Sequence, residues 1–202
     1  MRNISIIFLI IFTMISCQKE MKKDATLGAK NFQSDLIAFY NSDQSPIKIE
    51  NRKDFKGLTF FPVDKKYQVE VNFTKIQDGK VLEFQTSSGK IKKYVRYGKI
   101  AFEFDGKTNE LTLFQKSPVD SDHPNHLFLP FNDRTNGVSS YGGGRYIDLN
   151  LDDIKDKFLI DFNKTYNPYC AYEDGYSCPI PPSENRLDIG VEAGVSYLEE
   201  EH

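Results

Sequence analysis

Residues 161–186 read DFNKTYNPYCAYEDGYSCPIPPSENR, and the rest of the chain is organised around this stretch. It contains two of the three cysteines and four of the nine prolines of the chain, together with four tyrosines. Proline fixes the backbone and lacks an N–H donor, which excludes a helix or a central strand here. The aromatic content argues against disorder. We therefore predict a long ordered loop, a kind of segment that usually has a function.

Upstream of this loop, short apolar runs with a period of two predict an antiparallel sheet. Residues 67–73 show the pattern clearly, with apolar side chains at every second position. Turn dipeptides that contain glycine separate the next runs, at Asp78-Gly79, Ser88-Gly89 and Asp105-Gly106. The expected strands are residues 55–62, 67–73, 81–85, 91–97, 100–104, 111–115, 127–131, 145–151, 158–162 and 187–193. This pattern favours a mainly β fold, an antiparallel curled sheet (barrel or sandwich) of about nine strands.

One N-terminal helix is expected before the sheet. Apolar residues recur at helical spacing between Ala29 and Asn41, and Pro46 prevents the helix from continuing. We expect its apolar face to cap one end of the sheet. Residues 29–202 then make a single β-rich domain, which is long enough to bury a core of its own.

Residues 1–16 have the layout of a cleaved signal peptide. Arg2 precedes an apolar run of about a dozen residues, which is too short to cross a membrane because a spanning helix needs roughly 20. Ser16 directly before Cys17 resembles the lipobox of bacterial lipoproteins, in which the cysteine is acylated and becomes the new amino terminus. The alternative is an ordinary secretory signal with an incidental cysteine. Residues 17–28 are polar and predict a flexible tether.

We therefore expect a protein of the bacterial cell envelope whose membrane partner is reached through a lipid anchor at Cys17, at the outer membrane or the cell surface. Cys170 and Cys178 then remain as an even pair in an oxidising compartment. Such a pair predicts a disulfide, and a thiol or metal site is the alternative. The net charge of −3 and the lack of a long basic run argue against nucleic acid as a partner.

Two histidines, His123 and His126, lie among Asp120 and Asp122 and could hold a metal. Pro124 prevents their presentation on a helix, so we interpret the segment as a solvated loop and expect no metal site. The sequence indicates no particular cofactor.

A second group of polar residues suits an anionic ligand. Glycines 142–144 allow the backbone to approach a ligand closely, and Arg145 adds a permanent cation. The alternative is a glycine turn that leads into a strand. Asp161 and Asn163 flank Phe162 and would point to the face opposite that ring, either into a structural ion-pair network with an arginine or into a ligand site. Glu184 could act as a general acid or base.

The later part of the chain resembles the bacterial family known as domain of unknown function 1684. The segments that carry the resemblance are FLPFNDRT (128–135), SYGGGRY (140–146), DFN (161–163), YNP (166–168), CAY (170–172), CP (178–179) and PPSENRL (181–187), with FKGL (55–58) and RYG (96–98) upstream. The resemblance covers most of the chain after the tether. It implies no activity, because the family has none assigned to it.

Our main hypothesis is a binding module, in which the 161–186 loop and the 142–145 turn line a pocket for a small polar or anionic ligand. The expected ligand-binding residues are Arg145, Asp161, Asn163, Tyr166, Asn167, Glu184, Asn185 and Arg186. One alternative is a hydrolytic enzyme that uses Asp161, Glu184 or the cysteines, with or without a metal. Another is a structural protein of the envelope.

Overall fold

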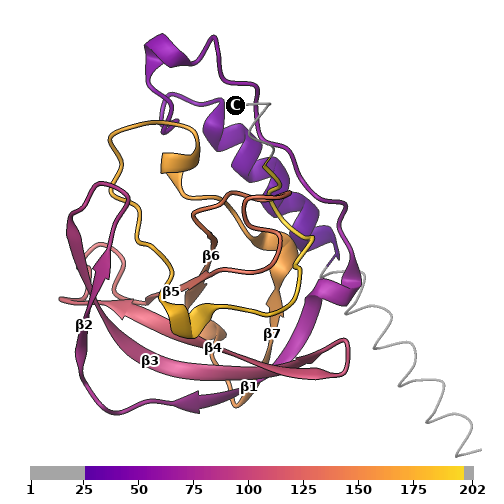
Figure 1. The fold of residues 1–202 in the computed structure, drawn as a ribbon, viewed down its shortest axis with the longest axis vertical. Coiled ribbons are helices and arrows are strands. Elements are labelled where there is room, and N and C mark those ends of the chain that lie inside the picture. The colour runs from indigo at the N-terminus through magenta and orange to yellow at the C-terminus, as the bar shows by residue number, and fades with distance from the viewer. Residues whose placement is uncertain (1–25, 198–202) are drawn as a thin grey trace, which may run out of the picture.

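The computed structural model describes residues 26–197, which form a curled antiparallel sheet with a helix beside it (Figure 1). Seven strands pair in the order β6-β5-β4-β3-β1-β7, and β2 pairs with β3 as well. The strands are β1 (Gln68–Lys75), β2 (Val81–Gln85), β3 (Ile91–Phe104), β4 (Lys107–Lys116), β5 (His126–Phe131), β6 (Arg145–Asn150) and β7 (Lys157–Asp161). The predicted mainly β, curled fold is confirmed, and the sheet is a half-barrel. The predicted signal peptide, Cys17 and most of the tether lie outside the described residues.

The strand count differs from the prediction for two reasons. The expected strands 91–97 and 100–104 are one long strand, β3. Residues 55–62 and 187–193 are not strands, and an isolated bridge connects Phe60 to Val195, just after the second range. Leu187, Val191 and Ala193 are nevertheless buried in the core. The alternation of apolar residues in 187–193 therefore reflects burial against the sheet and not pairing within it.

Strands β1 and β2 lie one after the other along the same edge of β3. Strand β1 pairs with the second half of β3 and β2 with the first half, while β4 occupies the other edge. Asp78-Gly79 therefore continues the chain along β3, and the prediction of a hairpin there was wrong. Asp105-Gly106 does form a hairpin between β3 and β4, with φ of 50° and 71° at its two residues, as a two-residue turn of this kind requires.

A register shift in β3 gives the sheet two apolar faces. Its pairing with β4 slips by one residue between Arg96 and Gly98. Because successive strand residues point to opposite faces, an extra residue exchanges the two faces. Tyr94 therefore lies with Phe114 and Phe128 in a smaller aromatic cluster, whereas Ile100 lies in the main core. A Cβ at Gly98 would come within 2.2 Å of the Phe73 ring, so the close packing there requires glycine.

Strand β5 is buried on both faces. Leu127, Leu129 and Phe131 belong to the main core, and Phe128 between them belongs to the smaller cluster. A continuous apolar run is typical of a strand that is covered on both sides. The main core is covered by the C-terminal residues 187–196, and the smaller cluster lies under the 161–186 segment.

A buried ion pair joins β6 to the loops around it. Arg145 is fully buried, and its Nη2 donates to Asp133 Oδ2 at 2.7 Å. The guanidinium also donates to the carbonyl oxygens of Val191 and Ala193, both at 2.6 Å. The other Asp133 oxygen accepts from the backbone N–H and the hydroxyl of Thr135. Burial lowers the pKa of Arg145, and the Asp133 carboxylate opposes this effect.

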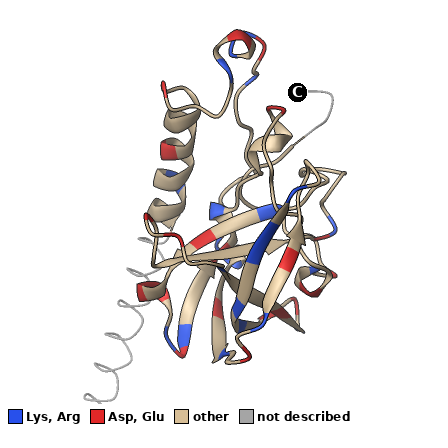
Figure 2. Ribbon diagram, turned by 90° about the vertical axis from the view of Figure 1, so that its left-hand side faces the viewer, with Lys and Arg blue, Asp and Glu red and all other residues tan. Residues whose placement is uncertain are grey.

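The predicted helix is confirmed over residues 26–40. The rings of Phe39 and Tyr40 near its end pack against Tyr169 and Tyr172, so the helix contacts the 161–186 segment there. No helix among the described residues is both long enough and apolar enough to cross a membrane. Figure 2 shows acidic and basic residues interspersed over the strands.

The ion pair at Arg145 makes a testable prediction about stability. Asp133→Ala should lower the free energy of unfolding by about 3–5 kcal/mol, because it leaves a buried cation without its partner. Arg134→Ala is the matched control, since the adjacent Arg134 pairs with Asp188 on the surface, with side chains 64% and 83% exposed. This control should cost less than about 1 kcal/mol. Urea denaturation measures both, and equal losses would contradict the role of the buried pair.

Candidate functional site

The structure does not bring together the residues that the sequence suggested for a ligand site. Arg145 faces the main core, because β6 places it on the same face as Ile147. Asp161 ends β7 and accepts hydrogen bonds from Gln68 Nε2 and from Asn163. Glu184 forms a bidentate ion pair with Arg96. No hydrogen bond or ion pair among residues 26–197 joins any two of Arg145, Asp161 and Glu184.

The predicted asparagines hold backbone segments in place. Asn163 is buried and bonds both the N–H and the carbonyl of Asp64. Asn185 is also buried and bonds the N–H and carbonyl of Thr112 and the carbonyl of Pro130. Asn167 donates to the hydroxyl of Tyr172 and to the carbonyl of Ser196. Asn163 and Asn185 thus replace regular secondary structure as partners of backbone groups.

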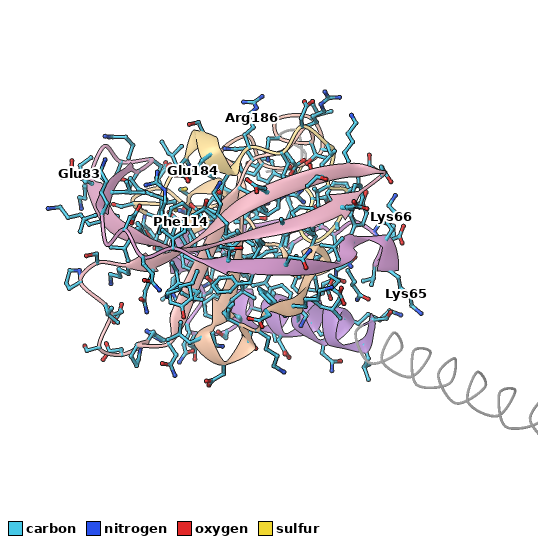
Figure 3. All side chains as sticks on the ribbon, turned by 90° about the horizontal axis from the view of Figure 1, so that it is seen from below. Lys65, Lys66, Glu83, Phe114, Glu184 and Arg186 are labelled. Carbon is cyan, nitrogen blue, oxygen red and sulfur yellow. The ribbon has the colours of Figure 1, made fainter. Side chains whose placement is uncertain are left out.

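Two residues of the predicted ligand-binding set remain, Arg186 and Tyr166, and they lie in different surroundings. Arg186 is exposed and points away from the sheet (Figure 3). Tyr166, in contrast, lines a cavity, and it is the one member of the predicted set that does so in the cavities described below.

The 161–186 segment closes the open side of the half-barrel. Tyr166 exchanges two backbone hydrogen bonds with Tyr146 on the outer edge of β6. Further along, Ile180 N–H donates to the carbonyl of Gln85 at the end of β2, and Pro179 bridges to Thr86. Residues 166–180 therefore run from one outer edge of this part of the sheet to the other. They form a roof over the face that carries the smaller aromatic cluster.

Between this roof and the sheet lies a cavity of about 390 Å³, which we call the aromatic cavity. Strands supply its floor, and the roof segment supplies the opposite wall. Its aromatic and proline lining is Tyr94, Phe128, Tyr146, Tyr166, Pro168, Tyr169, Tyr176 and Pro179. Its charged lining consists of Lys92, His126 and Asp148. An apolar pocket with a few convergent polar groups is the usual form of a small-molecule site.

Strand register explains why His126 and Asp148 meet. Phe128 on β5 is directly opposite Asp148 on β6, and residues two apart on a strand share a face. His126 Nε2 and Asp148 Oδ1 are 2.7 Å apart, and the hydrogen bond with Asp148 raises the pKa of His126. The Tyr166 hydroxyl donates to the other Asp148 oxygen. Burial and the Asp148 carboxylate raise the pKa of Tyr166 well above its ordinary value, so this hydroxyl stays protonated.

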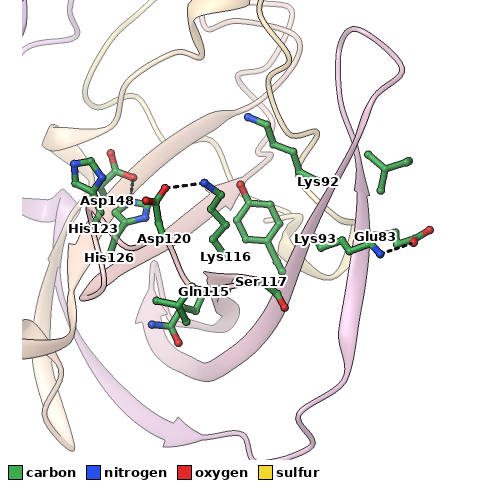
Figure 4. Close-up of a pocket in the computed structure, with 13 residues that line it drawn as sticks. Glu83, Lys92, Lys93, Gln115, Lys116, Ser117, Asp120, His123, His126 and Asp148 are labelled. Carbon is green, nitrogen blue, oxygen red and sulfur yellow. Dashed lines mark hydrogen bonds and ion pairs between the residues drawn. The ribbon is translucent and has the colours of Figure 1, made fainter.

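A second cavity of about 750 Å³, the outer cavity, adjoins the first (Figure 4). The two share Lys92, Tyr94, His126 and Asp148. Dashed lines in Figure 4 mark the ion pairs of Lys116 with Asp120, at 2.7 Å, and of Lys93 with Glu83, at 3.9 Å. In the described part of the chain, Lys92 is the lysine of these linings that has no carboxylate partner. It places an uncompensated positive charge where the two cavities meet.

His126 was assigned from the sequence to a solvated loop, yet it begins β5 and contacts the cavity. Lys92, Tyr94 and Asp148 were not singled out at all. A signal was present in their spacing, since Lys92 and Tyr94 lie two apart, as do His126 and Phe128. Each such pair puts a charged and an aromatic side chain on one face of a strand.

Among residues 26–197, no group of three or more His, Cys, Asp and Glu side chains is placed to hold a metal ion.

Cys170 and Cys178 lie side by side in the roof segment as free thiols. The N–H of Cys170 donates to Cys178 Sγ at 3.3 Å. The disulfide expected between them therefore stays a prediction.

Comparison with known proteins gives similarity without an activity. The family described as "Protein of unknown function (DUF1684)" matches residues 53–196, which include all the residues of the aromatic cavity. A solution NMR structure of an uncharacterized protein from Haloarcula marismortui is 35% identical, with a TM-score of 0.69. The match covers 88% of this chain and 97% of the archaeal chain. No curated protein matches the sequence.

One carboxylate, Glu173, fastens the roof to the segment before the sheet. Its side chain is 2% exposed and contacts Lys48 Nζ at 2.7 Å, the Lys48 N–H at 3.1 Å and Asn51 Nδ2 at 2.9 Å. The hydrogen bonds from the Lys48 and Asn51 side chains lower the pKa of Glu173 to about 2.

This lowered pKa predicts a pH-dependent effect of Glu173→Gln. Protonation is disfavoured in the folded state, so the stabilisation is fully present above the ordinary carboxyl pKa of 4.5 and is lost as the pH falls towards about 2. The variant should therefore melt at a lower temperature than the native protein near neutral pH, and the difference should shrink below pH 4.5. Melting curves across this range measure it. Asp174→Asn, at an exposed neighbour, is the control and should show no such trend.

Proposed function

Because the chain belongs to the DUF1684 family, to which no activity is assigned, we propose a function from the geometry of the two cavities. The protein binds a small organic anion with a flat apolar body. The observation that supports this most strongly is the unpaired Lys92, which lines the same two cavities as the His126–Asp148 pair.

The aromatic cavity offers different partners to the two ends of such a ligand. Tyr94 and Phe128 stack on each other in the floor, while Tyr169 and Tyr176 pack together in the roof. A flat ring between floor and roof would replace water on both of its faces. Lys92 would then attract the anionic group at the mouth of the cavity. His126 would contribute together with Asp148, which favours its protonated form and balances its charge.

Hydrolysis is a second candidate function, favoured by the same His126–Asp148 pair. An imidazole that is oriented by a carboxylate can act as a general base. The carboxylates on which the hydrolytic hypothesis first depended, Asp161 and Glu184, line neither the aromatic nor the outer cavity. Naphthyl acetate distinguishes the two functions, because an enzyme releases naphthol from it whereas a binding module releases the ester intact.

The lipid anchor is part of the proposal and is supported by the sequence of residues 1–17. The apolar run followed by Ser16 and Cys17 suits acylation at the cysteine thiol. Multiple acyl chains, each contributing about 0.8 kcal/mol per buried methylene, would hold the domain at a membrane surface. A binding module in the cell envelope would then meet ligands that arrive from outside.

Anion binding predicts a specific effect of Lys92→Ala. We expect the affinity for 2-naphthoate, measured by isothermal titration calorimetry, to fall roughly ten-fold to hundred-fold, since a charged hydrogen bond contributes about 1.5–3 kcal/mol. Lys99→Ala is the matched control, because Lys99 lies on the same strand and pairs with Glu110 away from both cavities. The neutral amide 2-naphthamide should bind native protein and the Lys92 variant equally.

The pH dependence gives a second measurement of the same prediction. Naphthoate affinity should fall as the pH rises through the raised pKa of His126, because the imidazolium loses its charge there. His126→Gln should remove this dependence. Equal affinities of naphthoate and naphthamide for the native protein would contradict the proposal of an anion site.

The lipid anchor predicts that Cys17→Ala moves the protein from the detergent phase to the aqueous phase in Triton X-114 partition of bacterial cells that express the full chain. Acylation requires the thiol, so the variant lacks the acyl chains that hold the native protein in detergent. Cys170→Ala is the control and should stay in the detergent phase. Partition of the Cys17 variant into detergent would exclude this anchor.

A further inference from the structure

The two thiols in the roof are held by different elements. Cys170 lies in the 3₁₀ turn η5 (Tyr169–Ala171), and Cys178 lies where the roof returns to the end of β2. Ser87, just after β2, fixes the second cysteine through two bonds: Cys178 N–H donates to Ser87 Oγ at 3.1 Å, and Ser87 N–H donates to the Cys178 carbonyl at 3.0 Å. The sulfur atoms therefore stay close without belonging to one regular element.

The environment distinguishes the two sulfur atoms. The side chains of Cys178, Ser87 and Tyr141 favour the thiolate form of Cys170. Their effect, that of Cys178 first, lowers the pKa of Cys170 to about 6. The same interaction with Cys170 raises the pKa of Cys178. Cys170 is therefore the cysteine that forms a thiolate more readily, and Cys178 is the one that stays protonated.

The two sulfurs are also approached from different sides. Cys178 lines the aromatic cavity. Cys170 lines a third cavity of about 360 Å³, which we call the rear cavity. Ile47, Asn51, Phe55, Tyr172 and Tyr197 contribute to the walls of the rear cavity. The rear cavity thus gives a small molecule a route to the half-buried Cys170 without opening the roof.

We propose that Cys170 and Cys178 are a redox-active pair that exchanges with small thiols and disulfides through the rear cavity. In the oxidising direction, the Cys170 thiolate attacks a disulfide RSSR, forms a Cys170–SR bond and releases RS⁻. The Cys178 thiol then loses its proton to that thiolate and attacks the Cys170 sulfur, which forms the Cys170–Cys178 bond and releases a second RS⁻. The two electrons pass from the protein dithiol to RSSR, and the reverse sequence oxidises two RSH molecules.

The stabilised thiolate makes reduction of the bridged pair easier than its formation. Hydrogen bonds that favour the thiolate stabilise the reduced pair relative to the bridged one, so the bridged form gives up its disulfide readily. A bridge with a purely structural role resists reduction by the glutathione pool. Ready reduction by glutathione therefore distinguishes a redox-active pair from the structural disulfide predicted from the sequence. The redox activity does not depend on the anion site.

Buffers with graded ratios of reduced to oxidised glutathione test the proposal on the intact chain, with acid quenching, alkylation and mass spectrometry. The native pair should change from the dithiol to the disulfide within this range of ratios. Cys178→Ser should instead accumulate a mixed disulfide with glutathione at Cys170, and Cys170→Ser should not form one at Cys178 at a comparable rate. A pair that stays bridged at every ratio, or one that forms neither bridge nor mixed disulfide, would overturn the proposal.

The pH profile of Cys170 alkylation tests the role of its neighbours. The titratable groups around the two sulfurs are Tyr40, Lys92, Tyr141, Tyr146 and Tyr169, and the charged residues Asp54, Lys56, Glu173 and Asp174 line the rear cavity with Cys170. Burial raises the pKa of each of these tyrosines, so they stay neutral where Cys170 titrates. The alkylation rate should be half-maximal near pH 6, and Tyr141→Phe or Ser87→Ala should move the midpoint upwards.

Ser88→Ala is the control, since this neighbour bonds Thr86 and Ser177 and not Cys170. An unchanged midpoint in both the Tyr141 and the Ser87 variants would overturn the assignment of Cys170 as the attacking thiolate.

Discussion

The buried pair of Arg145 and Asp133 is the constraint on which the arrangement of the site depends. A buried guanidinium must have its charge compensated, and Arg145 finds Asp133 and the Val191 carbonyl on the core side of β6. Because strand residues alternate, this choice sends Tyr146 and Asp148 to the opposite face. A slip of one residue would leave the cation over the aromatic cluster and remove Asp148 from the cavity. The ion pair thus determines the register of β6, although Asp148 lies on the opposite face of that strand.

The roof is held by polar side chains where regular pairing is impossible. Four prolines in residues 161–186 remove backbone donors, so the segment cannot join the sheet as a strand. Glu173, Asn163 and Asn185 bond backbone or side-chain groups far away in the sequence instead. The Asn185 bond lies in the interior, where an unsatisfied polar group is costly, and the other two are partly buried. A long irregular segment can therefore have a defined conformation and serve as one wall of a cavity.

Part of this structure could be predicted from the sequence. The period of two in residues 67–73, the helical spacing in residues 29–41 and the prolines of the loop correctly indicated strand, helix and irregular segment. The roles of the polar residues could not be predicted in the same way. Arg145 and Asn185 looked like ligand groups because charged and amide side chains suit ligands, but they suit buried backbone carbonyls equally well. The residues that do line the cavity, such as His126 and Asp148, come from neighbouring strands, and only the pairing register shows that they meet.

The way in which the roof meets the sheet also protects the protein from other chains. Strand edges carry unpaired backbone groups that can recruit strands of another molecule, which is how many β proteins aggregate. Here one segment bonds β6 at Tyr166 and the end of β2 at Ile180. Displacement of this single segment would free the backbone groups of Tyr146 on β6 and of Gln85 on β2 together. Self-association in solution should therefore begin with local opening of the roof, well before the core of the half-barrel unfolds.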